Sequence, residues 1–305
     1  RRPHAALRGG LSMLHPEARR ALEQEAGEVR VFEDGFDIET SRAEARASAA
    51  AEPREDVAEV RDVDADGVPC RLYRPADALP GVVVHLHGGG FVFHDVDVHD
   101  ASARRLANRT RTTVLSVDYR RPPEHRFPAA PDDVDRALAW WPEDGPVFLH
   151  GDSAGGNLAL VAALRNPGRA AGLVLIYPFL DPGAGFDSYV TAADGFDPRE
   201  ADWYWQQYAA APADLTDPDL APLLSERLGD LPPTLVVTAE HDPLRDEGEH
   251  LAALLAEAGV PVVGTRYLGQ VHGFWRHDRD FTAAEPAMLQ VASFLTWVRG
   301  RASGA

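Results

Sequence analysis

The sequence predicts an α/β protein in which helices flank a mostly parallel central sheet. From about residue 57 onward, short apolar runs alternate with amphipathic helical patterns. The chain has 305 residues, of which 45% are hydrophobic, enough for one large α/β unit with a substantial core. Such alternation is typical of a sheet that is covered by helices on both faces.

Two helices are expected before the sheet begins. Residues 16–27 start with Pro16 and an acidic residue and stop at Gly27, which is the usual pattern of helix start and stop signals. Residues 41–50 are rich in Ala, Glu and Arg and predict a second helix, and Pro53 ends this region.

Six short apolar runs predict strands that are buried on both faces, because they show no alternation of polar and apolar residues. These runs are residues 82–86, 113–117, 147–150, 173–176, 235–238 and 262–267. Between and after them lie helical patterns, in which apolar residues recur at spacings of three, four and seven. The helical patterns cover residues 134–141, 251–258 and 288–298.

Residues 182–215 interrupt this alternation with an aromatic-rich segment that contains no strand-like run. Asp197, Pro198 and Glu200 form a capping-box pattern that predicts the start of a helix. An inserted aromatic segment between two core strands suggests a lid. Its large aromatic side chains are Phe186, Phe196, Trp203, Trp205 and Tyr208.

Composition excludes several classes of function. The formal charge is −18 and the basic residues are scattered, so nucleic acid is a poor partner. All 30 basic residues are arginine, which excludes chemistry that needs lysine, such as a P-loop or a pyridoxal Schiff base. Cys70 is the single cysteine, so an internal disulfide and a thiolate zinc site are excluded. No apolar run is long enough to span a membrane, and no signal peptide is visible, which favours the cytoplasm.

The motif Gly-Asp-Ser-Ala-Gly at residues 151–155 is the strongest sign of chemistry in the chain. An apolar strand precedes it and a helix-forming run follows it, which is the context of a strained turn that exposes a nucleophilic serine. Ser153 is the expected nucleophile. The three glycines after His87 can direct backbone N–H groups at a substrate oxygen, and the N–H of Ala154, directly after the serine, can add one more, which is what an oxyanion hole requires.

A serine nucleophile needs a base and an acid that orients the base. His272 follows the last predicted strand and is the expected base, whereas His85 and His150 lie inside strands. His94 and His99 lie in an Asp-rich loop and are expected to face solvent. Asp242 follows a strand and is the expected acid; Asp246, in the first turn of the next helix, is the alternative. We expect no cofactor and no metal at this site.

Five blocks of sequence together resemble the hormone-sensitive-lipase-like family of carboxylesterases, most closely its bacterial members with a Gly-Asp-Ser-Ala-Gly motif. The blocks occur in the family's order across roughly residues 70–298. They are His87-Gly-Gly-Gly-Phe91, Asp118-Tyr-Arg-Arg-Pro-Pro-Glu-His-Arg-Phe-Pro128, Gly151-Asp-Ser-Ala-Gly-Gly-Asn157, Asp242-Pro-Leu-Arg-Asp-Glu-Gly248 and Val271-His-Gly-Phe274.

This resemblance implies an α/β-hydrolase core over residues 52–182 and 216–305, with a helical cap from residues 1–51 and 183–215. It also implies that Ser153, Asp242 and His272 form a catalytic triad, that the amides of Gly89, Gly90 and Ala154 form the oxyanion hole, and that His87 holds the glycine loop. It places the aromatic segment over Ser153, where its large side chains are expected to line an acyl pocket; the candidate substrate contacts are Phe186, Phe196, Trp203, Trp205 and Tyr208. One departure is visible, because Arg121-Pro122 replaces the Leu-Ala that is usual in the family. That stretch supports the glycine loop, so the departure is expected to alter local geometry only.

The sequence therefore predicts a cofactor-independent serine carboxylesterase that acts on small-molecule esters with acyl chains of roughly two to eight carbons. Deacetylation of a small-molecule metabolite by the same residues is an alternative. A metal-dependent hydrolase that uses His85 and His87, with His94 or His99, is a second hypothesis. A non-catalytic ligand receptor on the same fold is the third.

Overall fold

The computed structural model describes residues 13–302 and confirms the predicted α/β fold. Its strands form one sheet in the order β1-β2-β4-β3-β5-β6-β7-β8. β2 pairs antiparallel with both β1 and β4, and all other neighbours are parallel. The strands are β1 (Glu59–Asp64), β2 (Pro69–Arg74), β3 (Leu79–Leu86), β4 (Thr112–Val117), β5 (Val147–Asp152), β6 (Gly172–Ile176), β7 (Thr234–His241) and β8 (Val262–Val271).

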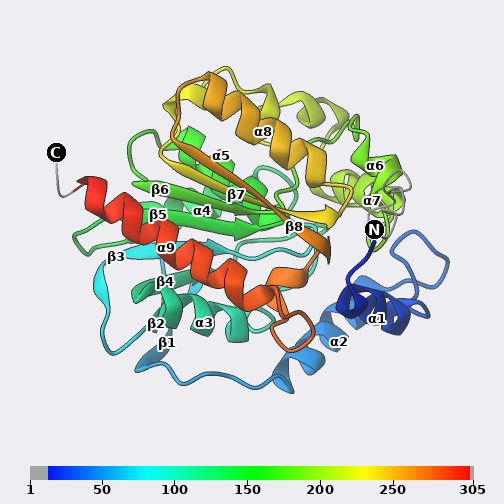
Figure 1. Cartoon of the computed structure of the whole chain (residues 1–305), viewed down its shortest axis with the longest axis horizontal. Coiled ribbons are helices and arrows are strands. Elements are labelled where there is room, and N and C mark those ends of the chain that lie inside the picture. The colour runs from blue at the N-terminus through cyan, green and yellow to red at the C-terminus, as the bar shows by residue number, and fades with distance from the viewer. Residues whose placement is uncertain (1–12, 303–305) are drawn as a thin grey trace, which may run out of the picture.

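Helices cover both faces of this sheet (Figure 1). The α-helices are α1 (Pro16–Glu25), α2 (Ile38–Ala50), α3 (Asp100–Thr110), α4 (Ala129–Trp140), α5 (Ala154–Arg165), α6 (Ser188–Thr191), α7 (Pro198–Tyr208), α8 (Arg245–Glu257) and α9 (Ala284–Ala302). Short 3-10 helices occupy Pro212–Thr216, Pro222–Leu224, Leu228–Asp230 and Phe274–Arg276. α3 and α9 pack together on one face, and α4 packs beside α5 on the other.

The central strands are buried along their whole length, as their apolar runs predict. Every residue of β4, β5 and β6 is buried. The expectation is wrong for residues 262–267, because β8 lies at the edge of the sheet and several of its residues are exposed. An edge strand is covered less than a central one, and the apolar run alone does not show where the strand lies in the sheet.

The antiparallel pair β1 and β2 was not expected from the apolar runs. β1 is the other edge strand, and its sequence Glu59–Asp64 has only two apolar residues, Val60 and Val63, and no fully buried position. A strand that is partly exposed lacks the continuous apolar run that marks the central strands. Both edge strands of the sheet, β1 and β8, therefore lack the continuous burial of the central strands.

Helices α1, α2, α6 and α7 lie together at the side of the sheet to which the parallel strands point (Figure 1). The capping box expected at Asp197 is present, and it begins α7 as predicted. Because parallel strands end at this edge, the loops after β3, β5, β7 and β8 meet beneath these helices. No helix within residues 13–302 is long and apolar enough to cross a membrane.

Candidate active site

Ser153 lies at a sharp turn between β5 and α5. Its φ is 55° and its ψ is −120°, a backbone conformation that non-glycine residues rarely adopt and that costs of order 1–3 kcal/mol. The flanking glycines permit the turn, because a Cβ on Gly151 would lie 2.0 Å from the carbonyl oxygen of Gly155. A Cβ on Gly155 would lie 1.9 Å from the carbonyl oxygen of Leu86. The motif therefore folds as the predicted strand-turn-helix.

His272 and Asp242 meet Ser153 at this turn. The Nε2 atom of His272 lies 3.0 Å from the Ser153 hydroxyl oxygen, and its Nδ1 atom lies 2.8 Å from Oδ2 of Asp242. Asp242 follows the last residue of β7 and is fully buried, whereas His272 follows the last residue of β8. The structure thus brings together three residues that are 119 and 30 positions apart in sequence.

Opposing effects act on the His272 ring. Burial disfavours the charged ring, but the negative charge of Asp242 and the hydrogen bond to it favour the charge more strongly. The net result is that the pKa of His272 is raised above the ordinary value of 6.5. A ring in this setting can accept a proton from a hydroxyl group and hold it beside a carboxylate.

The alternative acid does not reach the base. Asp246 lies in the first turn of α8, as expected, where it pairs with Arg245 at 2.7 Å and accepts a hydrogen bond of 2.9 Å from the backbone N–H of Ser188. Its role is to connect α8 with α6. Of the two aspartates that the sequence offered, only Asp242 contacts His272.

The glycine loop after β3 faces Ser153. Gly89 and Gly90 have φ values of 107° and 58°, which L-residues avoid. The N–H of Gly88 donates a hydrogen bond of 3.1 Å to Oδ1 of Asp152, next to Ser153. Gly89 and Gly90 line the same pocket as Ser153, and Ala154 is the first residue of α5. Backbone N–H groups from both sides of the serine are therefore available to a substrate oxygen.

His87 holds the base of this loop, as the family resemblance implies. Its ring stacks on Tyr119 with centroids 4.2 Å apart, and its Nδ1 atom lies 2.9 Å from the carbonyl oxygen of Gly88. The Tyr119 hydroxyl donates a hydrogen bond of 2.7 Å to the carbonyl oxygen of His87. His87 is therefore part of a packed support and does not face the serine.

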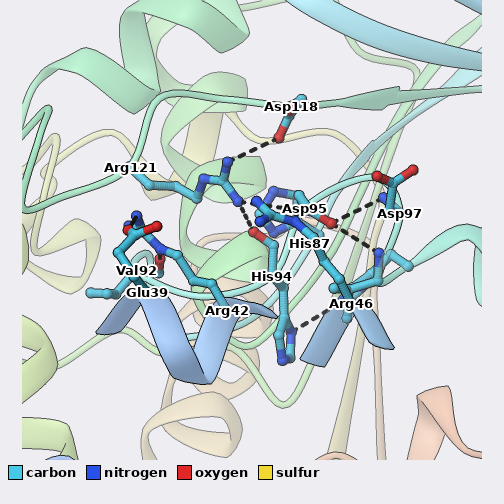
Figure 2. A network of polar contacts seen from close by, with 12 residues as sticks. Glu39, Arg42, Arg46, His87, Val92, His94, Asp95, Asp97, Asp118 and Arg121 are labelled. Atoms are coloured by element: carbon cyan, nitrogen blue, oxygen red, sulfur yellow. Dashed lines mark hydrogen bonds and ion pairs between the residues drawn. The ribbon is translucent and has the colours of Figure 1, made fainter. Parts of the chain in front are cut away.

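A network of arginines supports the chain that follows the glycine loop (Figure 2). From α2, Arg42 donates to the carbonyl oxygen of Val92 at 3.0 Å, and Arg46 pairs with Asp95 at 2.5 Å. From the other side, Arg121 donates to the carbonyl oxygen of His94 and lies 3.7 Å from Asp95. The departure at Arg121 therefore places a positive charge against the segment that supports the expected oxyanion hole.

A pocket of about 410 Å³ opens beside Ser153 and His272. Of the five aromatic residues expected to contact substrate, only Phe196 lines it. Trp205 and Tyr208 are buried in the core against Phe91, because they lie on the inner face of α7. The other two also lie outside the pocket lining: Trp203 stacks behind Phe93, which lines the pocket, and Phe186 packs against His250.

Several residues that line the pocket were not singled out from the sequence. Tyr204 lies directly over the glycine loop, since a Cβ on Gly90 would come 2.3 Å from its ring. The other residues not foreseen include Tyr177, Phe179, Arg30, Glu200 and Arg276. Tyr204 lies between the two tryptophans in sequence, and the sequence carries no signal that tells which of the three residues faces the pocket.

The histidines expected in solvent are placed differently by the structure. His99 is fully buried at the start of α3, and His94 is half-buried and lines the pocket. Their expected exposure is therefore wrong. In the loop that carries them, Arg46 and Arg121 lie 2.5 and 3.7 Å from the buried carboxylate of Asp95.

Comparisons with known proteins agree with this architecture. Residues 83–276 match a family model described as alpha/beta hydrolase fold. The chain is 40% identical to carboxylic ester hydrolase LipN of Mycobacterium tuberculosis over 78% of this chain and 70% of LipN. It is 35% identical to ethyl acetate hydrolase of Pseudomonas putida over 76% of this chain and 79% of that protein. A solved hyperthermophilic esterase from Pyrobaculum calidifontis matches with a TM-score of 0.84 and 36% identity, over 95% of this chain and 99% of the esterase.

Proposed function

The chain belongs to the alpha/beta hydrolase fold family, among the hormone-sensitive-lipase-like carboxylesterases, and is a carboxylic ester hydrolase; we propose that Ser153, His272 and Asp242 carry out its reaction. The observation that carries this proposal is the continuous contact from the serine hydroxyl through the imidazole to the buried carboxylate, at 3.0 and 2.8 Å. This order of contacts is that of a nucleophile, a general base and an orienting acid.

In the first half of the reaction, the Ser153 oxygen attacks the carbonyl carbon of the ester while His272 takes the hydroxyl proton. Asp242 keeps Nδ1 of the ring protonated, so that Nε2 presents its lone pair to the serine. The carbonyl oxygen becomes negative and is stabilised by the backbone N–H groups of Gly89, Gly90 and Ala154. The bond to the leaving oxygen then breaks, the alcohol takes the proton from His272, and an acyl-serine remains.

In the second half, water replaces the alcohol. His272 takes a proton from the water, the hydroxide oxygen attacks the acyl carbon, and the same N–H groups stabilise the second oxyanion. The bond to the Ser153 oxygen breaks, and the serine recovers its proton from the ring. All atoms of the products come from the ester and one water molecule, and no step requires a cofactor.

We further propose that the substrates carry acyl chains of roughly two to eight carbons. Phe196 and Tyr204 bound the pocket beside the serine, and rings in these positions limit the length of chain that fits. Each buried CH₂ group stabilises a bound acyl chain by about 0.8 kcal/mol until the pocket ends, after which longer chains gain nothing. Similarity to a relative named for ethyl acetate, an ester whose acyl group has two carbons, supports the short end of this range.

The helices over the pocket support the proposed division into a core and a cap. α2 contacts the glycine-loop segment through Arg42 and Arg46, and α7 contributes Tyr204 to the pocket. We therefore propose residues 1–51 and 183–215 as the cap and residues 52–182 and 216–305 as the core, of which residues 1–12 and 303–305 lie outside the described residues.

We also propose the cytoplasm as the site of action and small-molecule esters, without nucleic acid, as the partners. Burial raises the pKa of the single thiol, Cys70, to about 12, so it stays protonated and unreactive and needs no oxidising compartment. The net charge of −18 opposes binding to phosphate backbones. Cell fractionation followed by an activity assay tests the location.

A p-nitrophenyl ester panel of increasing acyl length tests the function, with Ser153→Ala as the matched control. We expect hydrolysis of short and medium chains and a loss on the order of 10⁶-fold in kcat for Ser153→Ala. The variant should fold normally, because the hydroxyl faces the pocket. A Ser153→Ala enzyme that keeps more than about a tenth of the wild-type kcat would contradict the nucleophile assignment.

A further inference from the structure

A row of histidines runs from the interior of the sheet to the edge of the pocket. Nδ1 of His150 on β5 lies 3.0 Å from Nδ1 of His85 on β3, and Nε2 of His85 lies 3.4 Å from Nδ1 of His99. Nε2 of His99 in turn lies 3.3 Å from Nδ1 of His94. His85, His99 and His150 are fully buried, and the proposed ester hydrolysis uses none of the four rings.

Asp152 joins this row beside His99. Its Oδ1 atom lies 3.7 Å from Nδ1 of His99, and its side chain is almost fully buried. The ligand atoms of His85, His99 and Asp152 all lie within 4.8 Å of one another. Two imidazoles and a carboxylate therefore converge on one point inside the protein, on the face of the sheet that α3 covers.

The separations in this group are too long for good hydrogen bonds. N–H···O and N–H···N hydrogen bonds are usually 2.7–3.2 Å long, so a separation of 3.7 Å is not one and 3.4 Å is a poor one. Two ligands of a tetrahedral zinc ion, by contrast, lie about 3.4 Å apart, because the edge of a tetrahedron is about 1.63 times a bond of about 2.1 Å. The observed 3.4 and 3.7 Å fit ligands that share an ion between them.

We propose that His85, His99 and Asp152 bind a divalent transition-metal ion, zinc by preference, which stabilises the fold beneath the active site. A water molecule would complete the tetrahedron, as is usual when a protein supplies three ligands to zinc. Ions that require octahedral coordination, such as magnesium, fit less well, since bonds of about 2.1 Å put neighbouring octahedral ligands about 3.0 Å apart. This inference replaces the sequence-based expectation that the chain binds no metal.

The outer histidines complete the arrangement. A zinc ion on Nε2 of His85 and Nδ1 of His99 leaves each ring with an N–H on its other nitrogen. His150 accepts from the first ring at 3.0 Å, and His94 accepts from the second at 3.3 Å. Ligating histidines usually donate their second N–H to such a partner, which orients the ring and strengthens its bond to the metal.

Polar atoms without partners mark the same part of the sheet. Within residues 13–302, Ser116 Oγ and His150 Nε2 are buried and make no hydrogen bond. Both residues pair with His85 in the sheet register, so the three side chains lie on one face of neighbouring strands. Buried polar atoms without partners therefore occur on both strands that flank His85.

The proposed ion would act on the active site through position alone. Asp152 immediately precedes Ser153 and accepts the N–H of Gly88, so it connects the nucleophile turn with the glycine loop. His85 lies two residues before His87, at the base of the same loop. An ion on His85 and Asp152 would fix these two segments relative to each other, and no bond of the ester is made or broken at the metal.

Metal content of the full-length chain tests this proposal directly, and it does not depend on esterase activity. The protein is unfolded in denaturant with a chelator and refolded either with zinc sulfate or without metal, because a fully buried site fills during folding. We expect about one zinc per chain after the zinc refolding, measured by inductively coupled plasma mass spectrometry on desalted protein. The zinc-loaded form should melt on the order of 5 °C higher than the metal-free form.

Substitutions distinguish this site from surface binding. His99→Gln and His85→Gln should each abolish zinc retention, and His150→Gln, which removes only an outer partner, should weaken it about 10–100-fold. His125→Gln is the matched control, because His125 is exposed and lies outside the row, and its zinc content should equal that of the wild type. Refolding with Co²⁺ should give the intense visible absorption of a tetrahedral cobalt site in the wild type but not in His99→Gln.

Two results would overturn the proposal. The first is less than about a tenth of a zinc per chain in refolded wild-type protein, with equal melting temperatures in both preparations. The second is an unchanged zinc content in His99→Gln, which would assign the metal to another place. The zinc content and melting temperature of the wild-type protein test the proposal even where a variant fails to fold.

Discussion

His272 is the residue on which the pH dependence of the reaction depends. Only the neutral ring can take the proton of Ser153, so activity should be lost as the pH falls through the pKa of His272. Asp242 raises this pKa above 6.5, despite the opposing effect of burial. Because the Asp242 carboxylate favours the charged ring, it moves the loss of activity on the acid side to higher pH.

We therefore predict that kcat/KM falls on the acid side with an apparent pKa above 6.5. Asp242→Asn should shift this limb to lower pH and reduce kcat by about 10⁴-fold, because the ring loses its charged partner and its fixed orientation. Initial rates between pH 5 and 8 on a short p-nitrophenyl ester measure both effects. A flat profile in the wild-type enzyme would argue against a histidine base.

At the scale of elements, α7 contributes Glu200 and Tyr204 to the pocket beside Ser153. Tyr204 lies over Gly90 in the glycine loop, whereas Trp205, the next residue, is buried behind the pocket wall. Consecutive residues on a helix point about 100° apart, so one residue reaches the substrate and the next reaches the core. The pocket lining thus follows from the rotation of α7 about its axis.

We predict that Tyr204→Ala shifts the preferred acyl chain toward longer esters, because it opens the pocket next to the glycine loop. Trp203→Ala is the matched control on the same helix, since Trp203 does not line the pocket and packs behind Phe93, which does. A p-nitrophenyl series from two to sixteen carbons measures the shift. A Tyr204→Ala profile equal to that of the wild type would mean that Tyr204 does not limit chain length.

α2 is held against the core by a buried arginine. Arg42 donates to the carbonyl oxygens of Val92 and Pro122 at 3.0 and 2.8 Å and pairs with Glu124 at 2.7 Å. Only 8% of its side chain is exposed. Removing the guanidinium leaves two buried carbonyl groups without donors and an acid without its partner.

We predict that Arg42→Ala lowers the free energy of unfolding by about 2–4 kcal/mol. The variant should also reduce kcat on short esters, because the segment after the glycine loop loses its support. Arg61→Ala is the control, since its pair with Glu59 is exposed and should contribute less than about 1 kcal/mol. Denaturant titrations compare the two, and equal losses would show that Arg42 does not anchor α2.

At the scale of the whole molecule, negative charge surrounds the site. The chain carries 48 acidic and 30 basic residues, and the pocket lining repeats this excess. Glu25, Glu28 and Glu200 line the pocket together with Arg30 and Arg276. A field of this sign reduces the local concentration of anionic substrates, and salt screens it over a length of about 10 Å at 0.1 M.

We predict that p-nitrophenyl hemisuccinate is hydrolysed with a kcat/KM about tenfold below that of p-nitrophenyl butyrate, its neutral partner of equal acyl length. Raising the salt concentration from 0.02 to about 1 M should narrow the difference, because only the charged ester is repelled. The Ser153→Ala enzyme corrects for spontaneous hydrolysis. A ratio that does not change with salt would rule out the charge of the protein as its cause.

Much of this protein can be predicted from local sequence. The central strands, the capping box of α7 and the turn at Ser153 depend on neighbouring residues, whose apolar runs and glycines have few structural solutions. Asp242 and His272 were identified because both follow a strand, and parallel strands end at the same edge. Local pattern and sheet topology together were sufficient to predict that Ser153, Asp242 and His272 lie at the same edge of the sheet.

The tertiary structure alone decided which side chains face the pocket and which pack behind it. Tyr204 and the two tryptophans beside it have similar residue types, and only the rotation of α7 against the core separates them. The burial of His99, its contact with His85 from β3, and the approach of Asp152 likewise join segments far apart in sequence. Such contacts depend on how whole elements pack, and a single sequence records the pattern within each element rather than the distances between elements.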